Sequence, residues 1–123
     1  MKVSITKKFE FEAAHKLPDH PGKCKNLHGH SYKLEVTVSS DQLNDQGMVM
    51  DFGDLKVIVN EHIINILDHS LLNDLFPVPT AEIMAQWIWV TLDVFIIELE
   101  KKRVKLKRIR LYETSNSYAE VME

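Results

Sequence analysis

The sequence predicts an α+β fold, in which a four-stranded antiparallel sheet carries two helices on one face in the order ββααββ. Segments at both ends of the chain alternate apolar and polar residues with a period of two, which is typical of strands. Between them, residues 52–67 and 81–100 have the apolar spacing and the capping residues of helices. With 123 residues, 45% hydrophobic and 27% charged, the chain has the size and composition of one globular domain covering residues 1–123.

The first two predicted strands carry histidines at the ends that should meet. Residues 2–14 form the first strand, and His15 continues its apolar face. The second strand begins at His28, runs to about residue 39, and has His28 and His30 on its own apolar face, because strand side chains alternate. If the two strands pair antiparallel, His15 lies beside His28 and His30.

The first helix should begin after Asp51, an N-cap residue, and end near Leu67. Its expected apolar stripe consists of Phe52, Leu55, Val59, His62, Ile63 and Ile66. Because His62 lies on this stripe, we interpret it as a packing histidine. Asp68 and His69 follow the helix, and adjacent residues point in different directions, so we expect a hydrogen-bonded pair or proton relay rather than a chelate.

A second helix should cover residues 81 to about 100, with Thr80 as its cap. It is apolar around most of its circumference, so part of its surface should meet another subunit or pack between the first helix and the sheet. Asp93 and other polar residues interrupt its most apolar part, which argues against a membrane span.

The third strand is expected over residues 104–112, and its apolar positions change from even to odd, which predicts a bulge near Lys107. Glu113 continues the apolar face. A short fourth strand should cover residues 118–122. Residues 101–110 contain seven of the fifteen basic residues. They could form a polyphosphate or nucleic-acid site, but we favour a charged turn and half-exposed strand, because the remaining chain is acidic and has no nucleic-acid motif.

Three imidazoles that leave one position open form the ligand set of a catalytic zinc site, so His15, His28 and His30 predict a Zn²⁺ centre. The alternative is a strand end with incidental histidines. Cys24, the only cysteine, lies between Lys23 and Lys25, whose charges favour the thiolate; the alternative is a free loop cysteine. A single cysteine excludes an intramolecular disulfide, and the N-terminus lacks the apolar core of a signal peptide, so we expect a soluble cytoplasmic protein.

Six short motifs are distributed over nearly the whole chain. They are Phe11-Glu12-Ala13-Ala14-His15, Cys24 with Leu27-His28-Gly29-His30-Ser31-Tyr32, Gly47-Met48-Val49-Met50-Asp51-Phe52, Leu67-Asp68-His69 with Leu72-Asn73, Pro79-Thr80-Ala81-Glu82, and Tyr112-Glu113-Thr114. In this order they resemble the 6-pyruvoyl-tetrahydropterin synthase superfamily. The short spacing from Cys24 to the Leu-His-Gly-His sequence resembles its bacterial 6-carboxytetrahydropterin synthase branch.

The resemblance implies a tunnelling fold, or T-fold, in which subunits join their sheets into a barrel, commonly as a hexamer built from two trimers, with the active site between neighbouring subunits. It also implies conversion of 7,8-dihydroneopterin triphosphate to 6-carboxy-5,6,7,8-tetrahydropterin, with release of triphosphate and acetaldehyde. In that branch the product is a precursor of queuosine and other 7-deazaguanines. A pyruvoyl-forming or divergent pterin synthase is a near alternative, and a non-enzymatic pterin- or metal-binding scaffold is a distant one.

The resemblance also implies roles for individual residues. His15, His28 and His30 would hold zinc, which binds the substrate's side-chain hydroxyls. Cys24 would be the general base, and Asp68 and His69 its proton-relay partners. Glu113 would bind the pterin ring, with Thr80 and Glu82 as secondary pterin-pocket positions. Ile83 departs from the asparagine that the family often has there.

Overall fold

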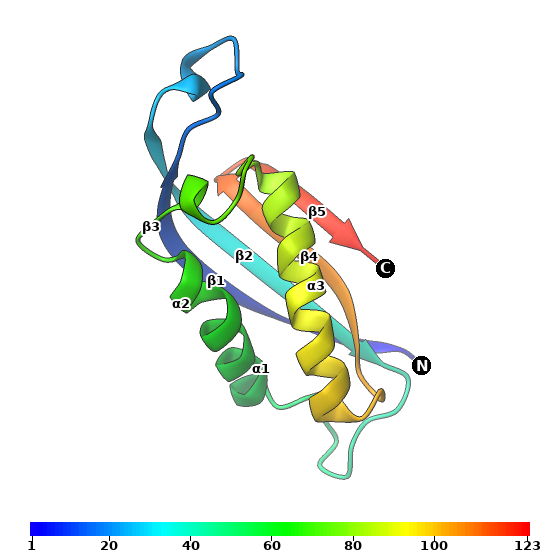
Figure 1. The fold of residues 1–123 in the computed structure, drawn as a ribbon. Coiled ribbons are helices and arrows are strands. Elements are labelled where there is room, and N and C mark those ends of the chain that lie inside the picture. Colours follow the sequence, from blue (N-terminus) through cyan, green and yellow to red (C-terminus); the bar gives the residue numbers. More distant parts are fainter.

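The computed structural model describes residues 1–123 and confirms the α+β fold class, with both helical segments on one face of the sheet (Figure 1). The long strands are β1 (Val3–His15), β2 (His28–Ser40), β4 (Lys105–Thr114) and β5 (Ser117–Met122). Neighbours among these four pair antiparallel in the order β1-β2-β4-β5.

The sheet contains a fifth strand that was not expected. The two-residue strand β3 (Ser70–Leu71) pairs parallel with Ala13 and Ala14 of β1. Two residues are too few to show an alternating pattern, so the sequence carries no signal for it. Its position matters because it holds the segment after the first helix against the end of β1.

The register of β1 and β2 is unbroken from Val3 opposite Ser40 to His15 opposite His28. Ala13 lies opposite His30. The predicted meeting of His15 with the other two histidines is therefore confirmed. The predicted bulge in β4 is also confirmed, since Thr37 pairs with Arg108 and Val38 with Leu106, which leaves Lys107 unpaired.

The first helical segment consists of α1 (Phe52–Val59), a π-helical turn η2 (Asn60–Ile64) and α2 (Asn65–Leu67). Asp51 caps it as predicted, because its Oδ2 accepts a hydrogen bond of 3.1 Å from the backbone N–H of Asp54. His62 stacks on Phe95 with ring centres 3.7 Å apart, which confirms its packing role.

The predicted apolar stripe of this segment is wrong at both ends. Phe52 is exposed in the first turn, with Lys7 Nζ 6.0 Å from its ring centre. Ile66 is exposed and Leu67 is buried instead. A π turn contains more residues than an α turn, so it rotates the residues that follow it relative to the regular helical period.

Helix α3 (Ala81–Glu100) is capped by Thr80, whose Oγ1 accepts a hydrogen bond of 3.2 Å from Ile83 N. One face of α3 is buried against the sheet, but Val90 and Val94 on the opposite face remain 66% and 59% exposed. As the sequence predicted, α3 has more apolar surface than the domain buries. None of the helices combines the length and hydropathy needed to cross a bilayer.

The opposite face of the sheet carries no helix (Figure 1). Charged side chains line this face. Arg110 NH2 lies 2.8 Å from Glu120 Oε1, and Arg108 NH2 lies 3.7 Å from Glu35. Arg103 contacts the protein itself, because its NH2 group donates a hydrogen bond to the carbonyl of Val49. These contacts support the interpretation of the basic run as a charged turn and half-exposed strand.

Candidate active site and metal centre

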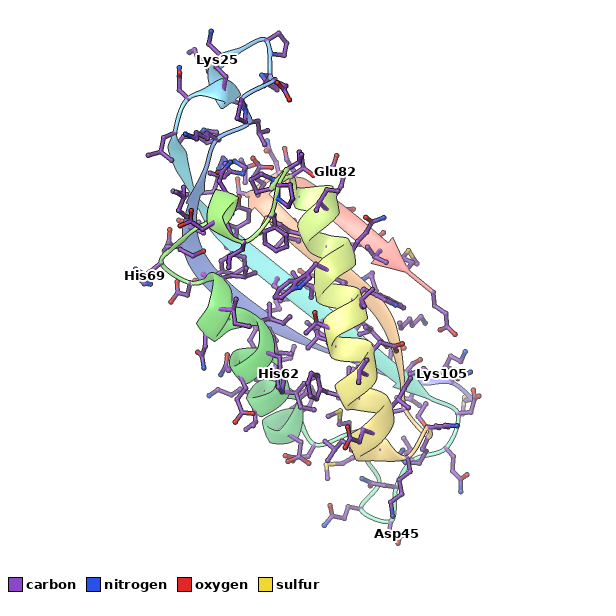
Figure 2. All side chains as sticks on the ribbon, in the orientation of Figure 1. Lys25, Asp45, His62, His69, Glu82 and Lys105 are labelled. Carbon is purple, nitrogen blue, oxygen red and sulfur yellow. The ribbon has the colours of Figure 1, made fainter.

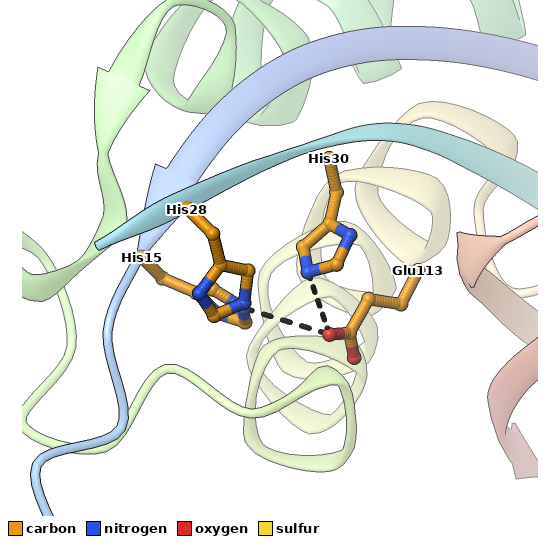
Figure 3. Close-up of side chains that lie close together, drawn as sticks. All are labelled: His15, His28, His30 and Glu113. Carbon is orange, nitrogen blue, oxygen red and sulfur yellow. Dashed lines mark ion pairs between the residues drawn. The ribbon is translucent and has the colours of Figure 1, made fainter. Parts of the chain in front are cut away.

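Three imidazoles converge where β1 ends and β2 begins (Figure 3). The ring centres of His15 and His28 are 4.5 Å apart, those of His15 and His30 5.0 Å, and those of His28 and His30 4.8 Å. The rings meet edge to face. The strand register therefore brings together all three residues predicted to hold a metal.

Glu113, at the end of β4, completes this group. Its Oε1 lies 2.9 Å from His30 Nε2 and 3.5 Å from His15 Nε2 (Figure 3). One ligand atom from each of His15, His28, His30 and Glu113 lies within 4.8 Å of the others. The sequence indicated that Glu113 shares the apolar face of its strand, but its place among possible metal ligands was missed.

Backbone carbonyls orient two of the imidazoles. His15 Nδ1 lies 2.8 Å from the carbonyl of Pro79, and His28 Nδ1 lies 2.7 Å from the carbonyl of Asn26. A carbonyl oxygen can only accept, so each Nδ1 carries the proton and donates. The Nε2 of each ring is then left with a free lone pair, as in many metal-binding histidines.

Two imidazole nitrogens of the site are buried without a hydrogen-bond partner. His15 is fully buried, and neither His15 Nε2 nor His30 Nε2 makes a hydrogen bond, despite the proximity of Glu113. Burial lowers the pKa of His30, and His15 and His28 lower it further, while Glu113 acts in the opposite direction. Leaving a buried polar atom unpaired costs about 1–3 kcal/mol, which a bound cation would offset. Neutral imidazoles and a carboxylate fit zinc or a similar divalent metal.

Tyr32 lies beneath these histidines on β2. Its ring centre is 5.5 Å from that of His30, and its hydroxyl is 3.5 Å from His15 Nδ1. Burial, aided by the charge of Glu113, raises the pKa of Tyr32 well above its usual range. The phenol therefore stays neutral and serves as the floor of the site.

Asp68 and His69 lie in ion-pair contact, with His69 Nδ1 3.1 Å from Asp68 Oδ2, and their role as a relay stays a prediction. Both are fixed to β1: Asp68 Oδ1 accepts from Glu12 N at 2.9 Å, and His69 N donates to Glu12 O at 2.6 Å. The bond from Glu12 N is the main reason that the pKa of Asp68 is lowered. The ring of His69 is 80% exposed and available to another molecule.

Cys24 lies in the short 3-10 helix η1 (Lys23–Lys25), within the loop that extends beyond the end of β1 and β2 (Figure 1). Its carbonyl accepts a hydrogen bond of 2.7 Å from Leu17 N. Its thiol is not part of the metal-binding group. Figure 2 shows the neighbouring Lys25 at one end of the molecule, well separated from His69 at the sheet edge.

Two hollows flank the histidine-bearing strand ends. One, of about 260 Å³, is lined by Glu82 and Glu113 together with Tyr118. The other, of about 420 Å³, lies beside Gly29 and His69. Thr80 and Glu82 were expected as secondary positions of a pterin pocket. Glu82 shares a hollow with Glu113, whereas the hydroxyl of Thr80 caps helix α3.

Comparison with known proteins gives a consistent result. The family described as 6-pyruvoyl tetrahydropterin synthase matches residues 4–123. A Synechocystis protein named 6-carboxy-5,6,7,8-tetrahydropterin synthase is 48% identical over 95 residues, covering 72% of this chain and 74% of its own. A Haemophilus influenzae protein of the same name is 36% identical over 144 residues, covering 97% and 98%.

The fold comparison agrees. The structure of Caenorhabditis elegans 6-pyruvoyl tetrahydropterin synthase superposes with a TM-score of 0.86 at 23% identity, covering 100% of this chain and 96% of that one. At this identity the likeness concerns the fold alone.

Proposed function

We propose, from the premise that the chain belongs to the 6-pyruvoyl tetrahydropterin synthase family, that it is a zinc-dependent 6-carboxytetrahydropterin synthase. Its substrate would be 7,8-dihydroneopterin triphosphate, and its products 6-carboxy-5,6,7,8-tetrahydropterin, acetaldehyde and triphosphate. The reaction would be a cytoplasmic step toward queuosine and related 7-deazaguanines.

The observation that carries this proposal is the convergence of His15, His28 and His30, two of them with buried Nε2 atoms that lack protein partners. A zinc ion bound there would act as a Lewis acid that binds the substrate's side-chain hydroxyls and lowers their pKa. The carbonyls of Pro79 and Asn26 hold two of the rings in the tautomer that binding requires.

The pterin ring would enter the hollow that Glu82 and Glu113 share. A pterin presents amino and ring N–H groups along one edge, and the Glu113 carboxylate can accept hydrogen bonds from them. Glu82 lines the same hollow and would contact the ring's periphery. Thr80 would contribute mainly by fixing the start of α3, from which Glu82 projects.

The proton-transfer groups would be Cys24 as general base and the Asp68–His69 pair as its relay. Within one chain these groups are separated, so we propose that Cys24 of one subunit works with Asp68 and His69 of its neighbour. The exposed ring of His69 and the adjacent hollow beside Gly29 leave room for a neighbouring loop.

Free strand edges support the assembly that this requires. Strand β3 pairs only with Ala13 and Ala14, so most of β1 has an open edge, and β5 forms the other edge of the sheet. Unpaired edges are sites where further strands can add. We therefore propose a homo-oligomer, a hexamer of two trimers, in which such edges join sheets into a barrel.

Product analysis tests the proposal. The zinc-loaded protein, incubated with 7,8-dihydroneopterin triphosphate, should release acetaldehyde and form a 6-carboxytetrahydropterin detectable by mass spectrometry. Formation of 6-pyruvoyl-tetrahydropterin would instead identify the pyruvoyl-forming activity of the family. Absence of turnover in the zinc-loaded oligomer would contradict both.

A further inference from the structure

We infer that Glu113 is also the fourth ligand of the metal in the free protein, and that it gives up this position when a pterin binds. The second part of this inference, the release of Glu113 on pterin binding, rests on the proposed function. The first part, the role of Glu113 as a metal ligand, concerns only the four side chains of the site.

Two separations between possible ligand atoms are close to those of a tetrahedral metal site. Zinc–nitrogen and zinc–oxygen bonds of about 2.0–2.1 Å place neighbouring ligand atoms of a tetrahedron about 3.3 Å apart. Glu113 Oε1 lies 3.5 Å from His15 Nε2 and 2.9 Å from His30 Nε2, on either side of that value. The carboxylate oxygen thus lies at ligand spacing from two of the three imidazole nitrogens.

Neither imidazole makes a hydrogen bond to the carboxylate, although Glu113 Oε1 lies within ion-pair distance of both His15 and His30. His15 Nε2 donates nothing to Glu113, because the proton of His15 lies on Nδ1, where it is bound by Pro79. Two lone-pair atoms at such a distance repel each other unless a cation lies between them. A metal shared by these atoms removes the repulsion and satisfies both buried nitrogens at once.

The same carboxylate faces the hollow that contains Glu82, Ser117 and Tyr118. A carboxylate bound to the metal closes the position that the chemistry must keep open for substrate hydroxyls. A pterin ring in the hollow offers several N–H donors to Glu113 and so provides an alternative partner. Glu113 would then link occupation of the ring pocket to opening of the metal.

Cobalt substitution tests both halves, because the visible spectrum of Co²⁺ reports its ligands. Glu113→Gln keeps the size of the side chain and removes its charge. We expect this variant to bind Co²⁺ at least about tenfold more weakly than the wild type, since even outer partners of metal ligands contribute 10- to 100-fold. Its cobalt spectrum should also differ from that of the wild type.

Glu82→Gln is the matched control, because Glu82 shares the hollow but is not among the possible ligands. It should keep the wild-type Co²⁺ affinity and spectrum. Circular dichroism of the metal-free proteins verifies that both variants fold. A Glu113→Gln protein with the affinity and spectrum of the wild type would overturn the inference.

The exchange is probed with unsubstituted pterin, which has the ring donors but no side-chain hydroxyls to bind the metal. Saturating pterin should shift the wild-type cobalt spectrum toward that of Glu113→Gln and leave the variant's spectrum unchanged. Bound pterin that leaves the wild-type spectrum unaltered would overturn the exchange. A wild type that binds no pterin would refute the proposed function, while the affinity comparison would still decide whether Glu113 is a ligand.

Discussion

The candidate metal site at the end of the sheet and the Cys24 loop differ in how complete they are within one chain. At the metal end, three strands place four ligand atoms within 4.8 Å of one another, and backbone carbonyls orient the rings. Cys24 lies on a loop outside that group, and the exposed His69 lies elsewhere, at the sheet edge. One chain therefore assembles a candidate metal site, whereas the groups proposed for proton transfer would require a second chain.

The largest effect is expected from removing ligands of the candidate metal site. His28→Ala with His30→Ala removes two of the four candidate ligands, so the purified double variant should contain no zinc and show no turnover. Metal analysis by mass spectrometry of the purified protein checks this. A double variant that keeps the zinc content of the wild type would show that the zinc is bound elsewhere.

Removing the thiol should separate chemistry from binding. Cys24→Ala should lower turnover by about two to four orders of magnitude, the usual contribution of a general base, while zinc content and pterin affinity stay at wild-type levels. Steady-state kinetics and a pterin titration measure the two quantities. Turnover close to that of the wild type would assign the base to another group.

A smaller effect is expected at the boundary between metal and ring pocket. Glu113→Ala should weaken pterin binding by about 10- to 100-fold, because ring donors would be buried without an acceptor. Isothermal titration calorimetry measures the change, with Glu82→Ala as the comparison for a carboxylate in the same hollow. An unchanged pterin affinity would reduce Glu113 to a residue of the metal site alone.

The smallest effect concerns stability and pH. The pKa of Asp68 is lowered in the folded protein, mainly by the N–H of Glu12, so the carboxylate stabilises the fold above its unfolded pKa of 3.8. That contribution disappears as the pH falls through the lower, folded-state pKa. The wild type should melt above Asp68→Asn at neutral pH, and the difference should shrink below about pH 4. A difference independent of pH would rule out a role for the charge.

The sequence predicted what depends on periodicity and on single caps. The alternation of apolar and polar residues in β1 and β2 predicted that the three histidines meet on one face. The change of the apolar positions in β4 from even to odd predicted the bulge at Lys107. Asp51 and Thr80 marked the helix starts. Such signals depend only on residues close together in the sequence, so they can be recognised before the fold is known.

What the sequence missed depends on longer-range geometry. The π turn at Asn60–Ile64 changes the phase of an otherwise regular helix. As a result, Ile66 is exposed, although the regular period predicts it on the buried stripe, and Leu67 is buried. The pairing of β3 with β1 requires that the helix end be brought to Ala13. Glu113 reaches the histidines only because β4 lies next to β2, and no spacing in the sequence expresses that neighbour relation.

Co-expression of two inactive variants tests the division of the site between chains most directly. Cys24→Ala and His69→Ala each spoil every site in their own oligomer. In mixed oligomers, some interfaces join an intact Cys24 to an intact His69, so activity should return at the fraction that random assembly gives, and sizing should show no stable monomer. If the two variants assemble together, as verified with two different affinity tags, and the mixture stays inactive, the relay lies within one chain and the account is contradicted.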